Sequence, residues 1–323
     1  MVMRAPLRMI LDVDTGIDDA LALAVAVRHR AVKLEAVLSV AGNVGLDLTT
    51  RNTLTVLDWL GAADVPVAAG AGGPLRGAVR EASHWHGADG LGGAALPRSR
   101  RTALDDGVGY LIERVLAEPG ELTVVCVAPL TNLALAVQRA PELVSAVREV
   151  VLMGGAARAP GNSTPVAEFN IYADPEAADV VFRQRWPLTM VGLDVTNRVL
   201  FTRHDRDALA GARSSEGLLL SEVTRRHFDD LGVEAIALHD PLAVAVALEP
   251  DLATMVETEA VVETRGEHTR GQTVVDLRSH RQTSMLPGPT RRVCVDVDVA
   301  RAREFFFTTL GLDAPGSAAL QPG

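Results

Sequence analysis

Four aspartates fall within eight residues near the start of the chain, at Asp12, Asp14, Asp18 and Asp19. Carboxylates placed so close together repel one another unless a cation or the hydroxyl groups of a ligand neutralise them. Ligand sets made only of oxygen atoms favour Ca²⁺ or Mg²⁺ over softer metals. The segment therefore predicts a metal site or a site for a polyhydroxylated ligand.

A simpler explanation applies to two of these acids. Asp18 and Asp19 open an apolar helical pattern, and the helix dipole favours acids in a first turn. Asp12 and Asp14 lie upstream, at the carboxyl end of a buried strand predicted over residues 7–13, so helix capping does not explain them. In open α/β sheets, ligands bind at that edge.

Composition narrows the class of partner. The chain has 323 residues, which is enough for one large domain or two smaller ones. Hydrophobic residues make up 48% of the chain and charged residues 22%, which is typical of a soluble globular protein. Its 31 basic and 41 acidic residues give a net charge of −10. This charge argues against nucleic acid or an anionic membrane as the partner and favours a small neutral or weakly charged ligand.

The cysteines and the N-terminal residues bear on the cellular compartment. Cys126 and Cys294 lie in apolar, strand-like runs, so we expect reduced core residues and neither a disulfide nor a metal pair. The first ten residues lack the pattern of a signal peptide, and no apolar run reaches membrane-spanning length. We therefore predict a cytoplasmic protein.

Apolar runs alternate with amphipathic segments over the first two-thirds of the chain. The predicted strands cover residues 9–13, 34–40, 65–69, 122–127, 149–153 and 188–193, and the predicted helices include 50–60, 107–116, 132–139 and 175–182. This alternation predicts an α/β fold with an open, mainly parallel sheet flanked by helices. Residues 255–277 predict a small C-terminal β-hairpin, and residues 301–310 a closing helix. We expect a single domain over residues 1–313 and a flexible tail over 314–323.

Polar residues follow four of these strands, at 12–19, 39–43, 128–132 and 153–155, so several strands deliver polar groups to one edge of the sheet. The loop at 83–93 is rich in Gly and His, which suits a mobile flap over a site as well as a plain surface loop. The loop at 161–170 contains Asn162, Glu168 and Asn170, which ordinary Asx turns also explain. His239 and Asp240 precede a helix expected to begin at Pro241, where Asp is a common N-cap and Pro a common first residue.

Taken together, these segments resemble the nucleoside hydrolases, the inosine-uridine preferring group. The matching motifs occur in the family's order and span residues 9 to about 300, at 12–20 (DVDTGIDDA), 40–43, 129–134, 153–155, 167–175 and 239–242. The resemblance implies a nucleoside hydrolase-like fold. It also implies hydrolysis of the N-glycosidic bond of ribonucleosides to ribose and a free nucleobase, with one Ca²⁺ as cofactor.

The resemblance also implies roles for individual residues. Asp14, Asp19 and Asp240 would ligate the Ca²⁺ with their carboxylates and Thr131 with its backbone carbonyl, and Asp14 would take a proton from the attacking water. The residues implied to hold the substrate are Asp18, Asn43, Asn162, Glu168 and Asn170 on the ribose hydroxyls, Met153 against the sugar, and the catalytic His239 facing the leaving base. We also expect His86 to contact the substrate and Asp12 to order the acidic loop through hydrogen bonds.

The chain departs from the family pattern in one place. Relatives often have tyrosine around the leaving base in the segment before the His-Asp pair, whereas residues 224–238 contain none and have His227 and Phe228 instead. The preferred nucleobase and the general acid therefore stay open.

Two other functions compete with this prediction. A haloacid-dehalogenase-like phosphatase also places paired aspartates after a strand, but it needs Thr or Val where Gly16 stands. A catalytically silent Ca²⁺- or ribose-binding protein on the same fold is the second. We predict that the protein binds a small-molecule ribonucleoside. We also predict that it assembles as a homo-oligomer, either a dimer or a tetramer.

Overall fold

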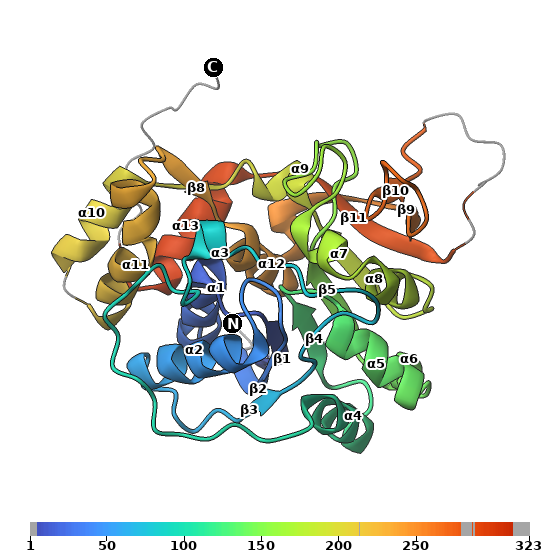
Figure 1. Ribbon diagram of the computed structural model, residues 1–323, viewed down its shortest axis with the longest axis horizontal. Helices are drawn as coiled ribbons and strands as arrows, with labels where there is room; N and C mark the ends of the chain where they lie inside the picture. Colours follow the sequence, from blue (N-terminus) through green and yellow to red (C-terminus); the bar gives the residue numbers. More distant parts are fainter. Residues whose placement is uncertain (1–4, 213, 279–285, 287, 313–323) are drawn as a thin grey trace.

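The computed structural model describes residues 5–212, 214–278, 286 and 288–312, and a nine-stranded sheet forms its centre (Figure 1). Across the sheet the strand order is β10-β9-β11-β6-β5-β4-β1-β2-β3. The strands are β1 (Leu7–Val13), β2 (Val32–Ser39), β3 (Val67–Ala69), β4 (Thr123–Cys126), β5 (Glu149–Met153), β6 (Leu188–Val191), β9 (Ala253–Val262), β10 (Thr273–Val275) and β11 (Thr290–Val297). The predicted tail at 314–323 lies outside the described residues.

Most neighbouring strands of this sheet run parallel, as the strand–helix alternation predicts. The predicted C-terminal hairpin is confirmed as the antiparallel pair β9 and β10, and β9 also pairs antiparallel with β11. Because β11 pairs with β6, the hairpin extends the main sheet. A second, two-stranded antiparallel sheet joins β7 (Leu200–Thr202) to β8 (Ala235–Ala237), and the sequence pattern did not predict it.

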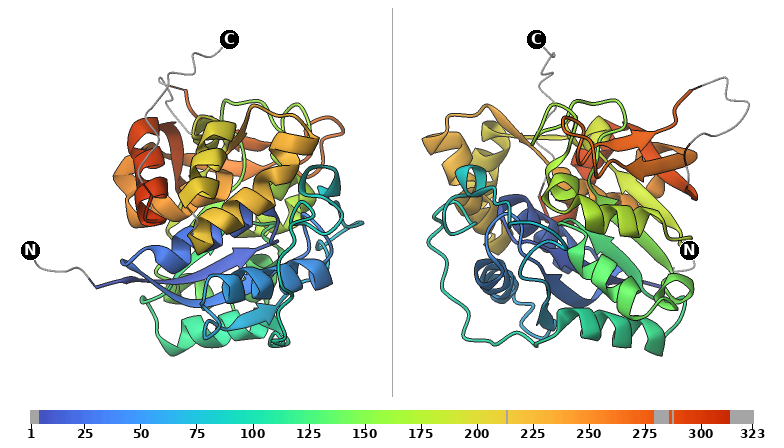
Figure 2. Two further views of the ribbon diagram at one scale, coloured as in Figure 1. Left: turned by 90° about the vertical axis from the view of Figure 1, so that its left-hand side faces the viewer. Right: turned by 45° about the vertical axis from the view of Figure 1, so that its right-hand side comes forward.

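Alternation along the strands divides the core into two layers. In β1, Met9, Leu11 and Val13 pack on one face of the sheet, and Ile10 packs on the other. The first face carries α1 (Ile17–Arg28), α2 (Leu46–Trp59), α10 (Arg203–Ala212), α11 (Ser215–Arg225), α12 (His239–Leu248) and α13 (Val299–Thr309). The second face carries α4 (Gly107–Ala117), α5 (Thr131–Arg139), α6 (Leu143–Ala146) and α8 (Pro175–Phe182). Figure 2 shows α13 and α4 on opposite sides of the sheet.

Short helical turns follow several strands, and some elements begin or end at other residues than predicted. Leu193 belongs to α9 (Leu193–Thr196) and not to the strand predicted over 188–193. Helix α12 begins at His239 and not at Pro241, so Asp240 lies inside the first turn and does not cap it. The other short elements are α3 (Ser83–His86), α7 (Phe169–Ala173), a π-helical turn (Arg226–Asp230) and a 3₁₀ turn (Pro250–Leu252).

The strand order places one crevice at the centre of the sheet. The chain moves outward from β1 to β2 and β3, and then returns to β4 on the other side of β1. Connections that leave in opposite directions open a crevice at the carboxyl ends of β1 and β4. Cys126 and Cys294 are buried and free, as expected. Among the described residues no helix has the length and apolarity needed to cross a bilayer.

Candidate active site

A cavity of about 550 Å³ opens at the carboxyl ends of the parallel strands. Ten of the residues singled out from the sequence line it, namely Asp14, Asp18, Asn43, His86, Met153, Asn162, Glu168, Asn170, His239 and Asp240. Asp19 and Thr131 are buried beside them and do not line the cavity wall. The predicted convergence of strand ends therefore places residues from widely separated segments around one cavity.

The carboxylates gather at one end of this cavity. Asp18, Asp19 and Asp240 each have a carboxylate oxygen within 4.8 Å of those of the other two. Asp14 lies outside this closest set, but its backbone N–H donates to Asp19 Oδ1 at 3.1 Å. Helix α1 supplies Asp18 and Asp19, the strand end of β1 supplies Asp14, and the first turn of α12 supplies Asp240.

Backbone and amide donors fix two of these carboxylates. Asp19 Oδ2 accepts hydrogen bonds from the Gly16 N–H at 2.8 Å and from Asn43 Nδ2 at 3.1 Å. Asp14 Oδ2 accepts one from the Asn43 N–H at 2.8 Å. Asn43, in the loop after β2, therefore holds both acids in place with its backbone and its side chain.

Several carboxylate oxygens of the cluster lack a partner. The buried atoms Asp14 Oδ1 and Asp18 Oδ1 make no hydrogen bond among the described residues. Burial and the neighbouring Asp18 charge raise the pKa of Asp19 to about 7, and burial followed by the charge of Asp19 raises the pKa of Asp14. Burial and the surrounding acids also raise the pKa of Asp240. Buried carboxylates that are unpaired and mutually repelling are a set that a bound cation would stabilise.

A second layer of hydrogen bonds lies beneath the cluster. Thr131 Oγ1 donates to Asp174 Oδ2 at 2.7 Å, which fixes the first residue of α5 at the end of β4. Asn132 Nδ2 donates to Asp12 Oδ1 at 2.8 Å, so Asp12 points into this layer and away from the cavity lining. We predicted that Asp12 orders the acidic loop through hydrogen bonds, but this side-chain hydrogen bond connects it to α5 instead.

The opposite wall comes from β5 and the loop before α7. Glu168 caps α7, because its carboxylate accepts hydrogen bonds from the backbone N–H groups of Asn170 and Ile171 at 2.9 and 3.1 Å. It also accepts one from the Gly155 N–H at 3.0 Å, just beyond β5. Asn170 Nδ2 donates to the Met153 carbonyl at 3.1 Å, and Asn162 Oδ1 accepts from the Phe169 N–H at 2.9 Å. These residues thus have structural bonds as well as a place in the cavity wall.

Two histidines face the acids. His239 Nδ1 lies 2.8 Å from Thr196 Oγ1, while burial lowers the pKa of the His239 ring and the Asp18 charge opposes that shift. His86 Nδ1 accepts a hydrogen bond from the Ile17 N–H at 3.1 Å, and burial lowers its pKa to about 3. His86 thereby ties α3, within the predicted flap at 83–93, to the N-terminus of α1.

The cavity wall also contains aromatic and cationic residues for which the sequence predicted no role, namely Arg80, Trp85, Phe169 and Tyr172. The Arg80 guanidinium lies 4.4 Å from the centre of the Tyr172 ring. Trp85 lies in the loop at 83–93 and Tyr172 in the motif at 167–175, both of which were singled out from the sequence. An aromatic residue within such a segment could therefore have been recognised as a candidate for the cavity wall. Arg80 lies in the connection between β3 and α3, which carries no motif.

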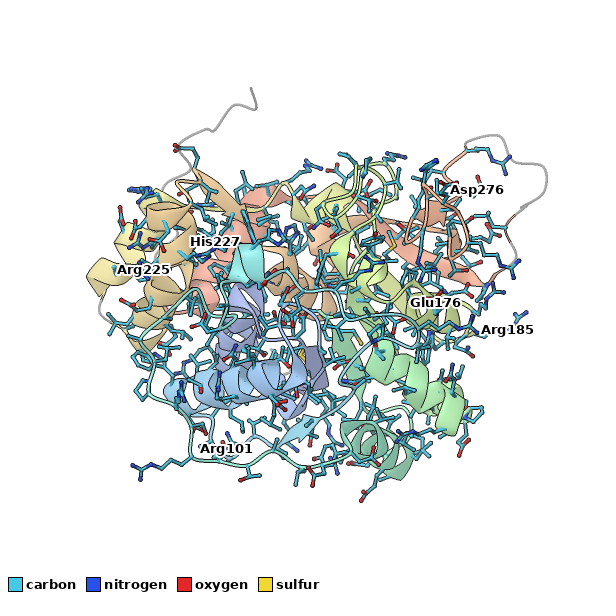
Figure 3. The ribbon with its side chains drawn as sticks, in the orientation of Figure 1. Arg101, Glu176, Arg185, Arg225, His227 and Asp276 are labelled. Carbon is cyan, nitrogen blue, oxygen red and sulfur yellow. The ribbon has the colours of Figure 1, made fainter. Side chains whose placement is uncertain are left out.

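The ring of His227 packs against the ring of Trp85. Their ring centroids lie 4.4 Å apart, and Figure 3 shows His227 beside α3. His227 lies on the π-helical turn and is 1% exposed, and neither of its ring nitrogens makes a hydrogen bond among the described residues. The adjacent Arg226 donates to the His84 carbonyl at 3.0 Å. The π-helical turn therefore contacts α3 through one ring pair and one hydrogen bond.

Comparison with known proteins gives one consistent match. Residues 9–304 match the family described as inosine-uridine preferring nucleoside hydrolase. The chain is 40% identical to the inosine-uridine preferring nucleoside hydrolase of Leishmania major over 286 residues, which cover 85% of this chain and 90% of that protein. It is 39% identical to the pyrimidine-specific ribonucleoside hydrolase RihA of Escherichia coli O9:H4 (strain HS), over 90% of this chain and 94% of that one. A plant nucleoside hydrolase structure, PpNRh1, superposes with a TM-score of 0.89 at 35% identity, covering 96% of this chain and 100% of that chain.

Proposed function

The chain belongs to the inosine-uridine preferring nucleoside hydrolases, and we propose that Asp14, Asp19 and Asp240 hold one Ca²⁺ with the Thr131 carbonyl. Like its relatives, the protein hydrolyses the N-glycosidic bond of ribonucleosides and releases ribose and a free nucleobase. The identity of the ion and the role of each residue are the parts that we propose.

The observation that carries this proposal is the carboxylate cluster at the end of the cavity. Carboxylate oxygens of Asp18, Asp19 and Asp240 lie within 4.8 Å of one another. Asp14 lies beside this set, and its Oδ1 is buried and makes no hydrogen bond among the described residues. Carboxylate and carbonyl oxygens are the ligands of a hard divalent cation, and the flexible geometry of Ca²⁺ suits a site drawn from β1, α1, α5 and α12. When bound, such an ion lowers the pKa of a coordinated water and orients it.

The hydrogen bonds of Asp14 assign different tasks to its two oxygens. Oδ2 accepts a hydrogen bond from the Asn43 N–H, whereas Oδ1 has no partner in the described part of the chain. We therefore assign Oδ1 as the atom that accepts the proton of the attacking water. The Asn43 contact fixes the carboxylate plane and so keeps Oδ1 directed toward the same point.

The remaining residues would bind the two parts of the substrate. Asp18, Asn43, Asn162, Glu168 and Asn170 would bind the ribose hydroxyls. Met153 would contact the sugar ring. Cleavage builds positive charge on the ribosyl ring, so a pocket lined by acids stabilises the transition state more than the ground state. His239 would donate a proton or a strong hydrogen bond to the departing base, and His86 would contact the substrate from α3.

A release assay tests the proposal. We expect wild-type protein to release ribose from inosine and uridine, to lose this activity on exhaustive chelation, and to regain it with Ca²⁺. Asp14→Asn should lower kcat by about 10³-fold or more, whereas Asp64→Asn, at an exposed aspartate, supplies the matched charge control. Full activity in metal-free protein would refute the metal proposal. Ca²⁺ binding without any ribose release would favour the alternative function, a catalytically silent Ca²⁺- or ribose-binding protein on the same fold.

The names of the relatives differ in the base that they mention, inosine and uridine in one case and pyrimidines in another. The preferred base of this chain therefore has to be measured with a panel of nucleosides. Assembly into a homo-oligomer and a cytoplasmic location stay predictions of the sequence.

A further inference from the structure

Helix α9 lies directly against the segment that follows β5, which leads into the loop of the cavity wall before α7. It follows β6, and its first residue, Leu193, donates its backbone N–H to the Gly155 carbonyl at 2.9 Å. A Cβ atom at Gly192 would lie 2.7 Å from that carbonyl oxygen, so only glycine allows this approach. The position of α9 is therefore fixed to the end of β5.

This short helix contacts both sides of the cavity. Asp194 accepts hydrogen bonds from the backbone N–H groups of residues 157, 158 and 159, at the start of the loop that carries Asn162 and Glu168. Two residues further on, Thr196 Oγ1 lies 2.8 Å from His239 Nδ1. Thr196 is completely buried, and it lines no part of the cavity.

We propose that Thr196 is a positioning residue that acts through His239. Its hydroxyl donates to Nδ1, which places the hydrogen of the neutral ring on Nε2 and leaves Nε2–H as the donor available to the cavity. The inference rests on the proposed function of His239 toward the leaving base.

Ring chemistry gives the reason for this direction of the hydrogen bond. A neutral imidazole carries one hydrogen, and the partner of one nitrogen decides which tautomer is present. If Nδ1 donated to Thr196, Nε2 would be an acceptor and would offer the leaving base no hydrogen bond. Thr196 is β-branched and buried within a helix, so its hydroxyl has few rotamers to choose from. It can therefore hold the ring in a single orientation.

Two variants separate the hydroxyl from the shape of the side chain. Thr196→Val keeps the volume and removes the hydrogen bond, whereas Thr196→Ser keeps the hydroxyl. We expect Thr196→Val to lower kcat/KM for inosine by roughly tenfold to a hundredfold, with most of the loss in kcat, as is usual for a partner that orients a reacting group. Cleavage of p-nitrophenyl riboside, whose leaving group needs no proton, should change by less than about twofold. Thr196→Ser should restore inosine cleavage.

Thr189→Val provides the matched control. Thr189 is 1% exposed and lies on β6 in the same strand–helix segment, but its hydroxyl donates to Glu149 at 3.1 Å instead of to a histidine. A double-mutant cycle gives the second arm. In a His239→Ala background, Thr196→Val should cost less than about twofold, because the residue through which it acts is absent.

A spectroscopic readout tests the geometry without turnover. In ¹⁵N-histidine spectra, wild-type His239 should show the tautomer protonated at Nε2, and Thr196→Val should change that signal while Thr189→Val leaves it alone. Equal losses on both substrates, or an undiminished loss in the His239→Ala background, would overturn the inference. If wild-type protein released no ribose at all, the proposed function itself would fail, which is a separate outcome.

Discussion

The side chain of His86 accepts a hydrogen bond from the backbone N–H of Ile17 at 3.1 Å, so a residue far along the chain satisfies the first N–H group of α1. The same turn of α1 carries Asp18, and His86 Nδ1 lies 3.9 Å from Asp18 Oδ1. Because Nδ1 is an acceptor, the neutral ring carries its hydrogen on Nε2. This hydrogen bond therefore links the connection between β3 and α4 directly to the acidic turn.

Loss of this contact should weaken substrate binding. We expect His86→Ala to raise KM for ribonucleosides by about tenfold and to cost about 1–2 kcal/mol in the free energy of unfolding, because the Ile17 N–H loses its partner. Steady-state kinetics and denaturant unfolding measure the two effects. His204→Ala is the matched control, because His204 is an exposed histidine on α10 that does not line the cavity. Similar losses in both variants would contradict a specific role for His86.

His239 should matter only for leaving groups that need a proton. We expect His239→Ala to reduce kcat/KM for inosine by about 10²- to 10⁴-fold, while p-nitrophenyl riboside is cleaved at nearly the wild-type rate. The comparison of the two substrates in one variant is the measurement. Equal losses would indicate that His239 only positions the substrate.

Calcium affinity should separate the ligands of the ion from the residues that hold ribose. We expect Asp240→Asn to weaken Ca²⁺ binding by at least about tenfold, because the affinity of an oxygen site depends on its ligand charge. Asp18→Asn should change it by less than about threefold if Asp18 binds only ribose. Isothermal titration calorimetry decides between them. The geometry makes this a strict test, because Asp18 lies within the closest carboxylate set and Asp14 does not. An equal loss in Asp18→Asn would make Asp18 a ligand.

The enzyme should discriminate more strongly between different sugars than between different nucleobases. The cavity has acids and amides on the predicted ribose side, and removal of a substrate hydroxyl would leave some of these buried groups unpaired. Sites built to bind a hydroxyl discriminate against its absence by roughly 10⁴-fold. We therefore expect 2′-deoxyinosine and 2′-deoxyuridine to be very poor substrates. Comparable kcat/KM values for uridine and 2′-deoxyuridine would show that these residues do not hold the 2′-hydroxyl.

His227 should make stability depend on pH. Burial lowers its pKa in the folded protein to about 4, so between pH 4 and the ordinary value of 6.5 the unfolded chain binds the proton more tightly. Stability that is present above pH 6.5 is therefore lost as the pH falls. His227→Phe keeps the ring beside Trp85 and removes this effect. Relative to the variant, wild type should lose about 1 kcal/mol between pH 7.5 and 5.5, as measured by denaturant unfolding.

The same substitution at His268, which is exposed, gives the baseline for the His227 experiment. A constant difference in unfolding free energy between wild type and His227→Phe across this pH range would contradict the prediction.

Local signals in the sequence determined the central strands and the acidic turn. The apolar runs that become β1 and β5 are bounded by polar residues, and their length and residue pattern can be recognised without the tertiary structure. Asp12 and Asp14 could be recognised as functional candidates for the same reason, because helix capping does not require acids at a strand end. The order of the motifs then gave the family.

The sequence could not determine which polar groups pair with one another. His86 and Ile17 are 69 residues apart, and Thr196 and His239 are 43 apart. Contacts at such separations depend on how helices pack across the sheet, and no local periodicity records that packing. The sheet containing β7 and β8 was missed for the same reason, since each of its strands has only three residues. Residue types and spacing thus determined the chemistry available to this protein, whereas the tertiary structure decided that Nδ1 of His86 and of His239 is occupied by another part of the chain.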